Sequence, residues 1–185
     1  MTTAKTLLTA DEFLAMPDDG KNYELVKGEL VEMPPPGFMH EFIVAQFIMR
    51  FGNFVRPRNL GIVTGGPGIY IEQNPDTVRA PDCAFISHER ITMTLPDRGY
   101  VFGLIPDLAV EVVSPDYSVA QARVRAQIWL DTGVRLALAA HIATREIITY
   151  RDDGDAQRFG MGDTLTCEPI LPGFACAVSD IFNHP

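Results

Sequence analysis

The chain has 185 residues, of which 46% are hydrophobic and 21% charged, so one domain with a sizeable core is expected. The net charge of −9 argues against a general nucleic-acid coat protein, which would carry a basic stripe, but a metal ion can supply local positive charge to an enzyme that meets phosphate. No apolar run is long enough to span a bilayer and residues 1–10 do not resemble an export signal, so we expect a cytoplasmic protein without membrane association.

Local signals in the first part of the chain predict one hairpin between two helices. Thr9 and Glu12 have the spacing of a capping box at the start of the first helix. A Lys27-Gly28-Glu29 turn separates two strand-like runs, and a proline-rich turn then precedes apolar residues at helical spacing. The expected elements are a helix over 10–16, strands over 23–26 and 30–33, and a helix over 38–55.

The second part of the chain is predicted to contain a strand–helix–strand crossover. Residues 108–113 are apolar except for Glu111, as in a strand that is buried on both faces. A helix over 118–132 should end at Gly133, and a crossover of this kind pairs its two strands in parallel. With hairpins before and after it, the fold class is α/β with a mixed β-sheet. The expected strands are 61–64, 69–72, 83–86, 108–113, 134–140 and 147–150, with a long loop over 87–104 and short strands and a helical turn beyond residue 165.

Two acidic residues stand where an acid is costly. Asp82 follows a proline at the start of an apolar strand, and Glu111 interrupts the apolar run of another. A buried carboxylate needs a partner, a proton or a metal ion, and Mg²⁺ commonly binds one or two carboxylates while keeping several waters. The alternatives are that Glu111 pairs with an arginine at a strand edge and that Asp82 caps a turn.

Several fragments, in this order, resemble a bacterial family of restriction-endonuclease-like proteins, abundant in cyanobacteria, within the PD-(D/E)XK nuclease superfamily. The resemblance covers roughly residues 8 to 183. The fragments are Glu24-Leu25-Val26-Lys27-Gly28-Glu29-Leu30, a proline-rich turn with His40, Arg79-Ala80-Pro81-Asp82, Pro106-Asp107-Leu108-Ala109-Val110-Glu111-Val112-Val113-Ser114-Pro115, Gly133-Val134-Arg135 and Leu171-Pro172-Gly173-Phe174.

The resemblance implies a restriction-endonuclease-like core over about 22–151, with an N-terminal β-hairpin and a mixed β-sheet flanked by helices. It also implies a phosphodiesterase site that depends on Mg²⁺ or Mn²⁺, with Asp82 and Glu111 as metal ligands. His40 would help to position water or phosphate. Glu24 matches an acid on the family's first hairpin, although a solvated acid at a strand end explains it better.

One feature departs from the superfamily pattern, which places a lysine two residues after the second acid, where this chain has Val113. In the family that lysine sits on the following helix, and the matching position here is Arg125. The chain has no lysine beyond Lys27, so no shift within the core recovers one. Arginine keeps the charge and binds phosphate but stays protonated, so it cannot act as a general base. The alternative is a surface arginine whose stem covers Trp129.

These observations favour a metal-dependent endonuclease acting on nucleic acid, DNA in the first place, and working as a homodimer because cutting two strands often needs two sites. A catalytically impaired nuclease fold that acts as a binding module is the first alternative. A hydrolase of small phosphorylated molecules is the second. The remaining histidines, His88, His141 and His184, are expected on the surface or in loops, and Cys83 is expected to be a free buried thiol.

Overall fold

The computed structural model describes residues 7–115 and 118–184. These residues form two compact units: a smaller one from residues 7–35, Gly68–Ala80 and Met93–Leu104, and a larger one from Pro36–Pro67, Pro81–Thr92, 105–115 and 118–184. The single domain expected over residues 1–185 stays a prediction. Among the described helices, none has the length and hydropathy needed to cross a membrane.

The larger unit is built on a six-stranded mixed sheet, in the order β10-β9-β8-β7-β6-β3. The central pair, β7 and β8, is parallel and joined by a helix, whereas every other neighbouring pair is antiparallel. The α/β class with a mixed sheet is therefore confirmed. The strands are β3 (Gly61–Gly65), β6 (Cys83–Ser87), β7 (Leu108–Val113), β8 (Leu136–His141), β9 (Glu146–Tyr150) and β10 (Ala156–Phe159).

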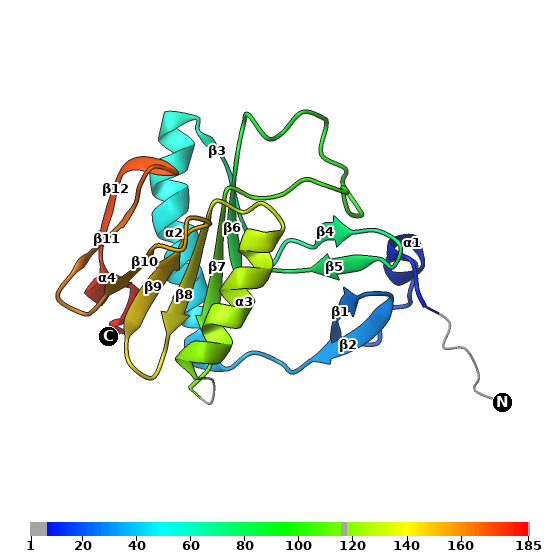
Figure 1. Cartoon of the computed structure of the whole chain (residues 1–185), viewed down its shortest axis with the longest axis horizontal. Helices are drawn as coiled ribbons and strands as arrows, with labels where there is room; N and C mark the ends of the chain where they lie inside the picture. Colours follow the sequence, from blue (N-terminus) through cyan, green and yellow to red (C-terminus); the bar gives the residue numbers. More distant parts are fainter. Residues whose placement is uncertain (1–6, 116–117, 185) are drawn as a thin grey trace. The chain divides into compact units, whose positions relative to one another are not determined.

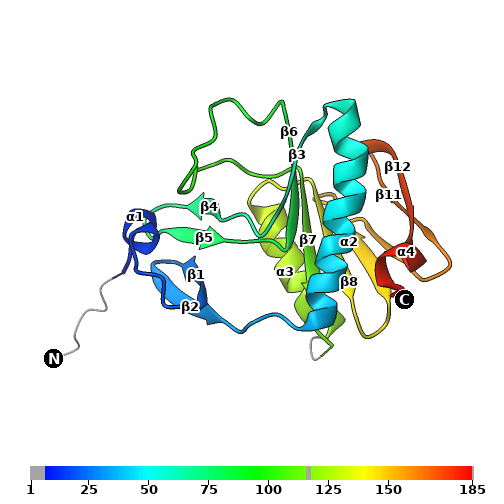
Figure 2. The same ribbon diagram turned by 180° about the vertical axis from the view of Figure 1, so that it is seen from behind.

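One helix covers each face of this sheet (Figures 1 and 2). Helix α2 (Phe38–Val55), followed by the short 3-10 helix η1 (Arg56–Arg58), packs on β3, β6 and β7. Helix α3 (Val119–Asp131) is the crossover and packs on β7, β8 and β9. Ser118 and Gln121 form a capping box at its start, which stabilises the first turn of the helix directly after the loop that leaves β7.

Alternation along β7 decides which of its residues meet each helix. Val110 and Val112 belong to the same buried cluster as Phe47 of α2, whereas Glu111 contacts α3. Successive side chains of a strand point to opposite faces, so β7 presents its one acid to the α3 side.

The C-terminal segment completes the core on the α2 side. Strands β11 (Thr164–Cys167) and β12 (Leu171–Ala177) form an antiparallel pair, followed by α4 (Val178–Phe182). The ring of Phe174 lies 4.9 Å from that of Phe51, centroid to centroid. The hydrophobic core thus continues past residue 151, where the nuclease-like core was expected to end.

The smaller unit contains a four-stranded antiparallel sheet in the order β2-β1-β5-β4 and a short helix. The expected hairpin is present, and its turn places Lys27 and Gly28 at φ 50° and 77°. A side chain at Gly28 would also collide with Leu7, since an added Cβ would lie 2.6 Å from the Cβ of Leu7. The elements are α1 (Ala10–Leu14), β1 (Asn22–Val26), β2 (Glu29–Met33), β4 (Ile69–Glu72) and β5 (Thr77–Arg79).

The elements differ from the sequence-based expectation in few places. Strands β5 and β10 were not predicted, because both are short and carry no apolar alternation. The expectation that His141 is a surface or loop residue is wrong: it ends β8 and is 4% exposed, because the strand continues one residue further into the sheet.

Candidate functional site

Asp82 is held beside Glu111 by two hydrogen bonds to β7. Its backbone N–H donates to the carbonyl of Val110 (3.0 Å), and its Oδ2 accepts the N–H of Val112 (2.6 Å). The two bonds flank Glu111 on the neighbouring strand. Pro81 has no N–H to donate, and Asp82 follows it directly before the first residue of β6. The contacts of Asp82 with β7 thus extend the hydrogen bonds of the sheet beyond the start of β6.

His40 approaches Asp82 from the first turn of α2. Its Nε2 lies 3.3 Å from Oδ2 of Asp82, and its Nδ1 lies 3.2 Å from Oε1 of Glu41. The hydrogen bond to Asp82 raises the pKa of His40 above its usual value, against the opposing effect of burial. The imidazole is therefore held between two carboxylates and favours its protonated form.

Glu111 is buried on β7, and its side chain is 7% exposed. Its Oε1 accepts the indole N–H of Trp129 (2.7 Å), and its Oε2 lies 3.0 Å from Nε of Arg125. Both partners belong to α3, one turn apart, which places them over the same part of the sheet. The acid inside an apolar strand is thus hydrogen-bonded and paired with an arginine.

The four residues selected from the sequence all belong to the larger unit, where they form two pairs. His40 contacts Asp82, and Arg125 contacts Glu111, while the backbone of β7 connects the two acids. The alternative to the metal hypothesis was that Glu111 pairs with an arginine, and this ion pair with Arg125 is present. It brings Arg125 of α3 into contact with the sheet.

The only groups of the candidate site that suit a hard divalent cation are the two carboxylates, of Asp82 and Glu111. Among the residues that the structure describes, no three histidine, cysteine, aspartate or glutamate side chains gather closely enough to hold a metal ion. Mg²⁺ does not need three, because it binds through one or two carboxylates and keeps several waters. The neighbouring thiol is no ligand, since burial, with a smaller effect of the charge on Asp82, raises the pKa of Cys83 to about 12.

Two contacts of the acids were not foreseen. Trp129 was considered only as a side chain that the stem of Arg125 covers, and its hydrogen bond to Glu111 was not predicted. Asp107 is 1% exposed, and its carboxylate contacts Arg90, Arg135 and the N–H of Ser87. Its position directly before the apolar run of β7 was the one sign in the sequence of its burial.

The expectation that Glu24 is a solvated acid is wrong. It lies on β1 in the smaller unit, 7% exposed. Its Oε1 accepts the N–H of Ala80 at 3.3 Å, and its Oε2 lies 3.4 Å from Nη1 of Arg79. Strand β5, which the sequence did not predict, pairs with β1 and brings these partners to it.

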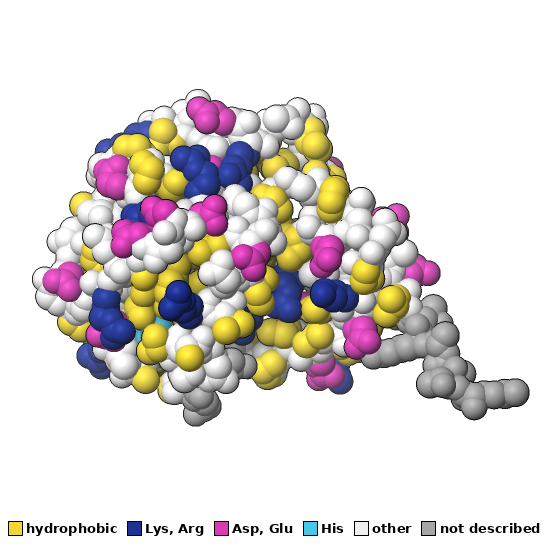
Figure 3. Space-filling model, in the orientation of Figure 1, with side chains coloured by type: hydrophobic (Ala, Val, Ile, Leu, Met, Phe, Trp, Pro, Cys, Tyr) yellow, Lys and Arg dark blue, Asp and Glu magenta, His cyan; other side chains and the backbone are white. Residues whose placement is uncertain are grey.

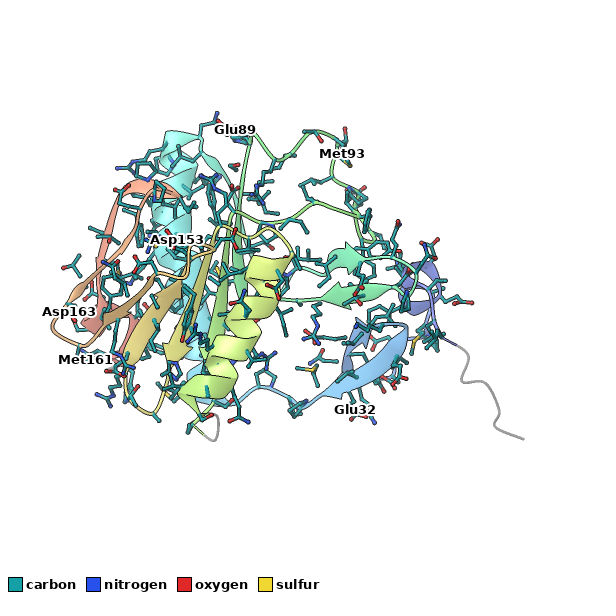
Figure 4. The ribbon with its side chains drawn as sticks, viewed as in Figure 1. Glu32, Glu89, Met93, Asp153, Met161 and Asp163 are labelled. Carbon is teal, nitrogen blue, oxygen red and sulfur yellow. The ribbon has the colours of Figure 1, made fainter. Side chains whose placement is uncertain are left out.

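Basic and acidic side chains are interspersed on the face of the larger unit drawn in Figure 3. Much of the negative charge is carried by exposed turn residues, such as Asp153 and Asp163 on either side of β10 (Figure 4). The arginines near the end of α2 contact the protein itself: Arg50 binds the carbonyl of Asp180, and Arg58 lies over the ring of Phe54. These contacts within the protein account for both arginines, so neither is evidence of a surface that binds nucleic acid.

A mixed sheet with one helix on each face defines a nuclease-like α/β fold. It is shared with the crystal structure described as a putative nuclease belonging to DUF820 from Anabaena variabilis ATCC 29413, with a TM-score of 0.77 and 20% sequence identity over 95% of this chain and 97% of that chain. The chain belongs to the Uma2 family, described as "Putative restriction endonuclease", which it matches over residues 10–179. No curated protein matches it. The family expected from the sequence is thereby confirmed.

Proposed function

We propose that this chain is an endonuclease that hydrolyses phosphodiester bonds of nucleic acid with the help of a divalent metal ion, Mg²⁺ or Mn²⁺. The observation that carries the proposal is that Asp82, directly before β6, accepts the N–H of Val112 next to Glu111 on β7, and that each acid has a cationic partner. Two carboxylates on neighbouring strands suit a metal ion that keeps several waters for its substrate. Membership of the family supports the same class of reaction.

A bound metal ion would lower the pKa of a water and stabilise charge on the phosphate. Asp82 and Glu111 would hold it through carboxylate oxygens, in competition with the contacts of Asp82 with His40 and of Glu111 with Arg125. His40, next to Asp82, would help to position water or a phosphate oxygen. Each role belongs to a side chain whose position the structure gives.

Arg125 would stand in for the missing lysine. Its guanidinium carries a permanent charge and five N–H donors, of which the Nε–H faces Glu111. Such a group stabilises the charge that develops on a phosphate during attack, but it cannot remove a proton from water. Arg125 would therefore stabilise charge, and another group would have to remove the proton.

A second candidate function is a nuclease fold that binds without cutting. The observation that favours it is the saturation of Glu111 by Trp129 and Arg125, since a metal ion would compete with the Arg125 ion pair. Such a protein would bind nucleic acid or another protein and would show weak affinity for Mg²⁺. Hydrolysis of a small phosphorylated molecule by the same pair of acids is a weaker variant of the first proposal.

The two functions are separated by measuring metal binding and cleavage on the same samples. Calorimetry with Mg²⁺ and Mn²⁺ would compare the wild type with Asp82→Asn and Glu111→Gln, and Glu89→Gln would serve as the control because Glu89 is an exposed acid outside the site. Single-stranded and duplex DNA, and RNA, would be incubated with each protein with and without metal. Supercoiled plasmid would reveal single nicks.

Loss of both metal binding and cleavage in the two site variants, with the control unchanged, supports the endonuclease. Metal binding without cleavage of any substrate favours the binding module. Absence of specific binding in the wild type overturns the metal site. If Arg125→Lys cuts faster than the wild type while Arg125→Met does not cut, charge at this position is required and lysine supplies it better.

We propose DNA as the first substrate to test, a homodimer as the working form and the cytoplasm as the compartment. The support for a dimer is that cutting both strands of a duplex needs two sites. Light scattering at several concentrations, with and without a duplex oligonucleotide, tests it: a mass of one chain under all conditions contradicts the dimer.

A further inference from the structure

The only tryptophan of the chain is hydrogen-bonded to one of the two acids of the candidate site. Trp129 lies on the buried side of α3 and is 2% exposed. Its indole N–H donates to Oε1 of Glu111 at 2.7 Å, which is short for an N–H···O bond and typical of one to a charged acceptor. A buried indole N–H needs an acceptor, and the acceptor in this chain is one of the two acids of the candidate site.

The two partners of Glu111 differ in how firmly the protein holds them. Trp129 is packed on all sides, and its carbonyl accepts the side-chain hydroxyl of Thr132 (2.7 Å) and the N–H of Val134 (3.2 Å), which fixes the end of the helix. Arg125 has a side chain that is 32% exposed. The guanidinium has solvent beside it and a flexible stem, whereas the indole has no room to turn away.

The two carboxylate oxygens of Glu111 therefore have different surroundings. Oε1 faces the fixed indole, and Oε2 faces the partly exposed Arg125. Oε2 is thus the oxygen next to the partly exposed side chain, and Oε1 is the oxygen next to the buried one. A hydrogen bond to a buried donor restricts rotation of the carboxylate.

We propose that Trp129 is a positioning residue for the metal site: its indole holds Glu111 through Oε1 so that Oε2 is presented to the cation. This inference rests on the proposed function. Outer partners that orient a ligating side chain typically change metal affinity 10- to 100-fold when they are removed. Trp129 acts in this way on Glu111, and it touches neither the metal nor the substrate.

The test is Trp129→Phe, which keeps an aromatic ring in the core and removes the donor. We expect its Kd for Mn²⁺, measured by calorimetry, to be at least about 10-fold weaker than that of the wild type. Ile147→Val is the matched control, because Ile147 is fully buried on β9 and its trimming lowers stability without touching Glu111. This control should bind Mn²⁺ like the wild type even if its melting temperature falls as far.

A second measurement does not require Trp129→Phe to fold. The wild type has one indole N–H signal in a ¹⁵N-correlated NMR spectrum because it has one tryptophan. We expect this signal to move upfield in Glu111→Gln, where the charged acceptor is lost, and to shift saturably when diamagnetic Mg²⁺ is added to the wild type. In Glu89→Gln the signal should keep its wild-type position and should show the same shift with Mg²⁺.

The outcomes separate the two ideas. Weaker Mn²⁺ binding in Trp129→Phe, with the control unchanged, supports the positioning role. Wild-type affinity in Trp129→Phe, or an indole signal that ignores both Glu111→Gln and Mg²⁺, overturns that role and leaves the nuclease proposal standing. Absence of Mn²⁺ and Mg²⁺ binding by the wild type overturns the proposed metal site first and the positioning role with it. If Trp129→Phe fails to fold, the indole signal decides.

Discussion

Replacement of Asp107 with alanine is expected to lower the free energy of unfolding by about 3 kcal/mol. The buried carboxylate accepts the N–H of Ser87 at 2.8 Å, and its Oδ1 lies 3.1 Å from Nε of Arg90 and 3.0 Å from Nη1 of Arg135. The bond to Ser87 accounts for about 1.5 kcal/mol as a hydrogen bond to a charged group. The two arginine side chains are 28% and 50% exposed, so each contact is credited with only roughly 0.7 kcal/mol.

Thermal and urea unfolding at pH 7 measure this loss. For a chain of this size about 3 kcal/mol corresponds to a drop in Tm of roughly 6–12 °C. Asp107→Asn keeps an acceptor for Ser87 and should lose about half as much. Glu89→Gln removes the same charge from an exposed position in the loop after β6, labelled in Figure 4, and should stay within about 0.5 kcal/mol of the wild type. A loss below about 1 kcal/mol in Asp107→Ala would refute the assignment of this stability to the three contacts of the carboxylate.

Two further predictions concern titration and reactivity. Burial lowers the pKa of His141, with a smaller raising effect from Glu146 and a smaller lowering effect from Arg158, so the unfolded chain takes up a proton near pH 6.5 more readily than the folded one. The stability supplied by the neutral imidazole is complete above that pH and is lost as the pH falls below it. In urea titrations, the free energy of unfolding of His141→Gln should therefore decline less between pH 7 and pH 5 than that of the wild type. The same decline in both proteins would contradict this. The buried thiol of Cys83, with its pKa raised to about 12, should resist Ellman's reagent at pH 8 in the native protein and react on unfolding, whereas rapid native labelling would show that β6 opens.

Local signals were sufficient where an element depends on its own sequence. The capping box at Thr9, the long apolar stripe of 38–55 and the apolar run around Glu111 each indicated the element that the structure contains. The crossover through α3 followed from chain order, because a strand, a helix and a second strand pack in parallel in one sheet. The two acids of the site could be found for the same reason: each interrupts or precedes an apolar strand.

Contacts between distant segments could not be found in this way. Trp129 is 18 residues from Glu111 along the chain, and its donor has no sequence signature that separates it from a core residue. Glu24 looked solvated because its hairpin is short and polar, and only its pairing with β5 buries it. Asp107 needed Arg90 and Arg135, one on each side of it in sequence, to become a buried acid. A polar group is buried only where it has partners, and partners that are distant along the chain can be identified only once the fold is known.

The contribution of β11, β12 and α4 to the core on the α2 side has a consequence for synthesis of the chain. Leu165, Leu171 and Ile181 are at most 1% exposed and share a cluster with Phe51 of α2. At 5–20 residues per second, roughly 6–23 s pass between the appearance of Phe51 and that of its first C-terminal partner at a ribosome. During that interval part of the apolar stripe of α2 has no cover of its own, so the nascent chain offers a binding surface to chaperones that the finished protein no longer has.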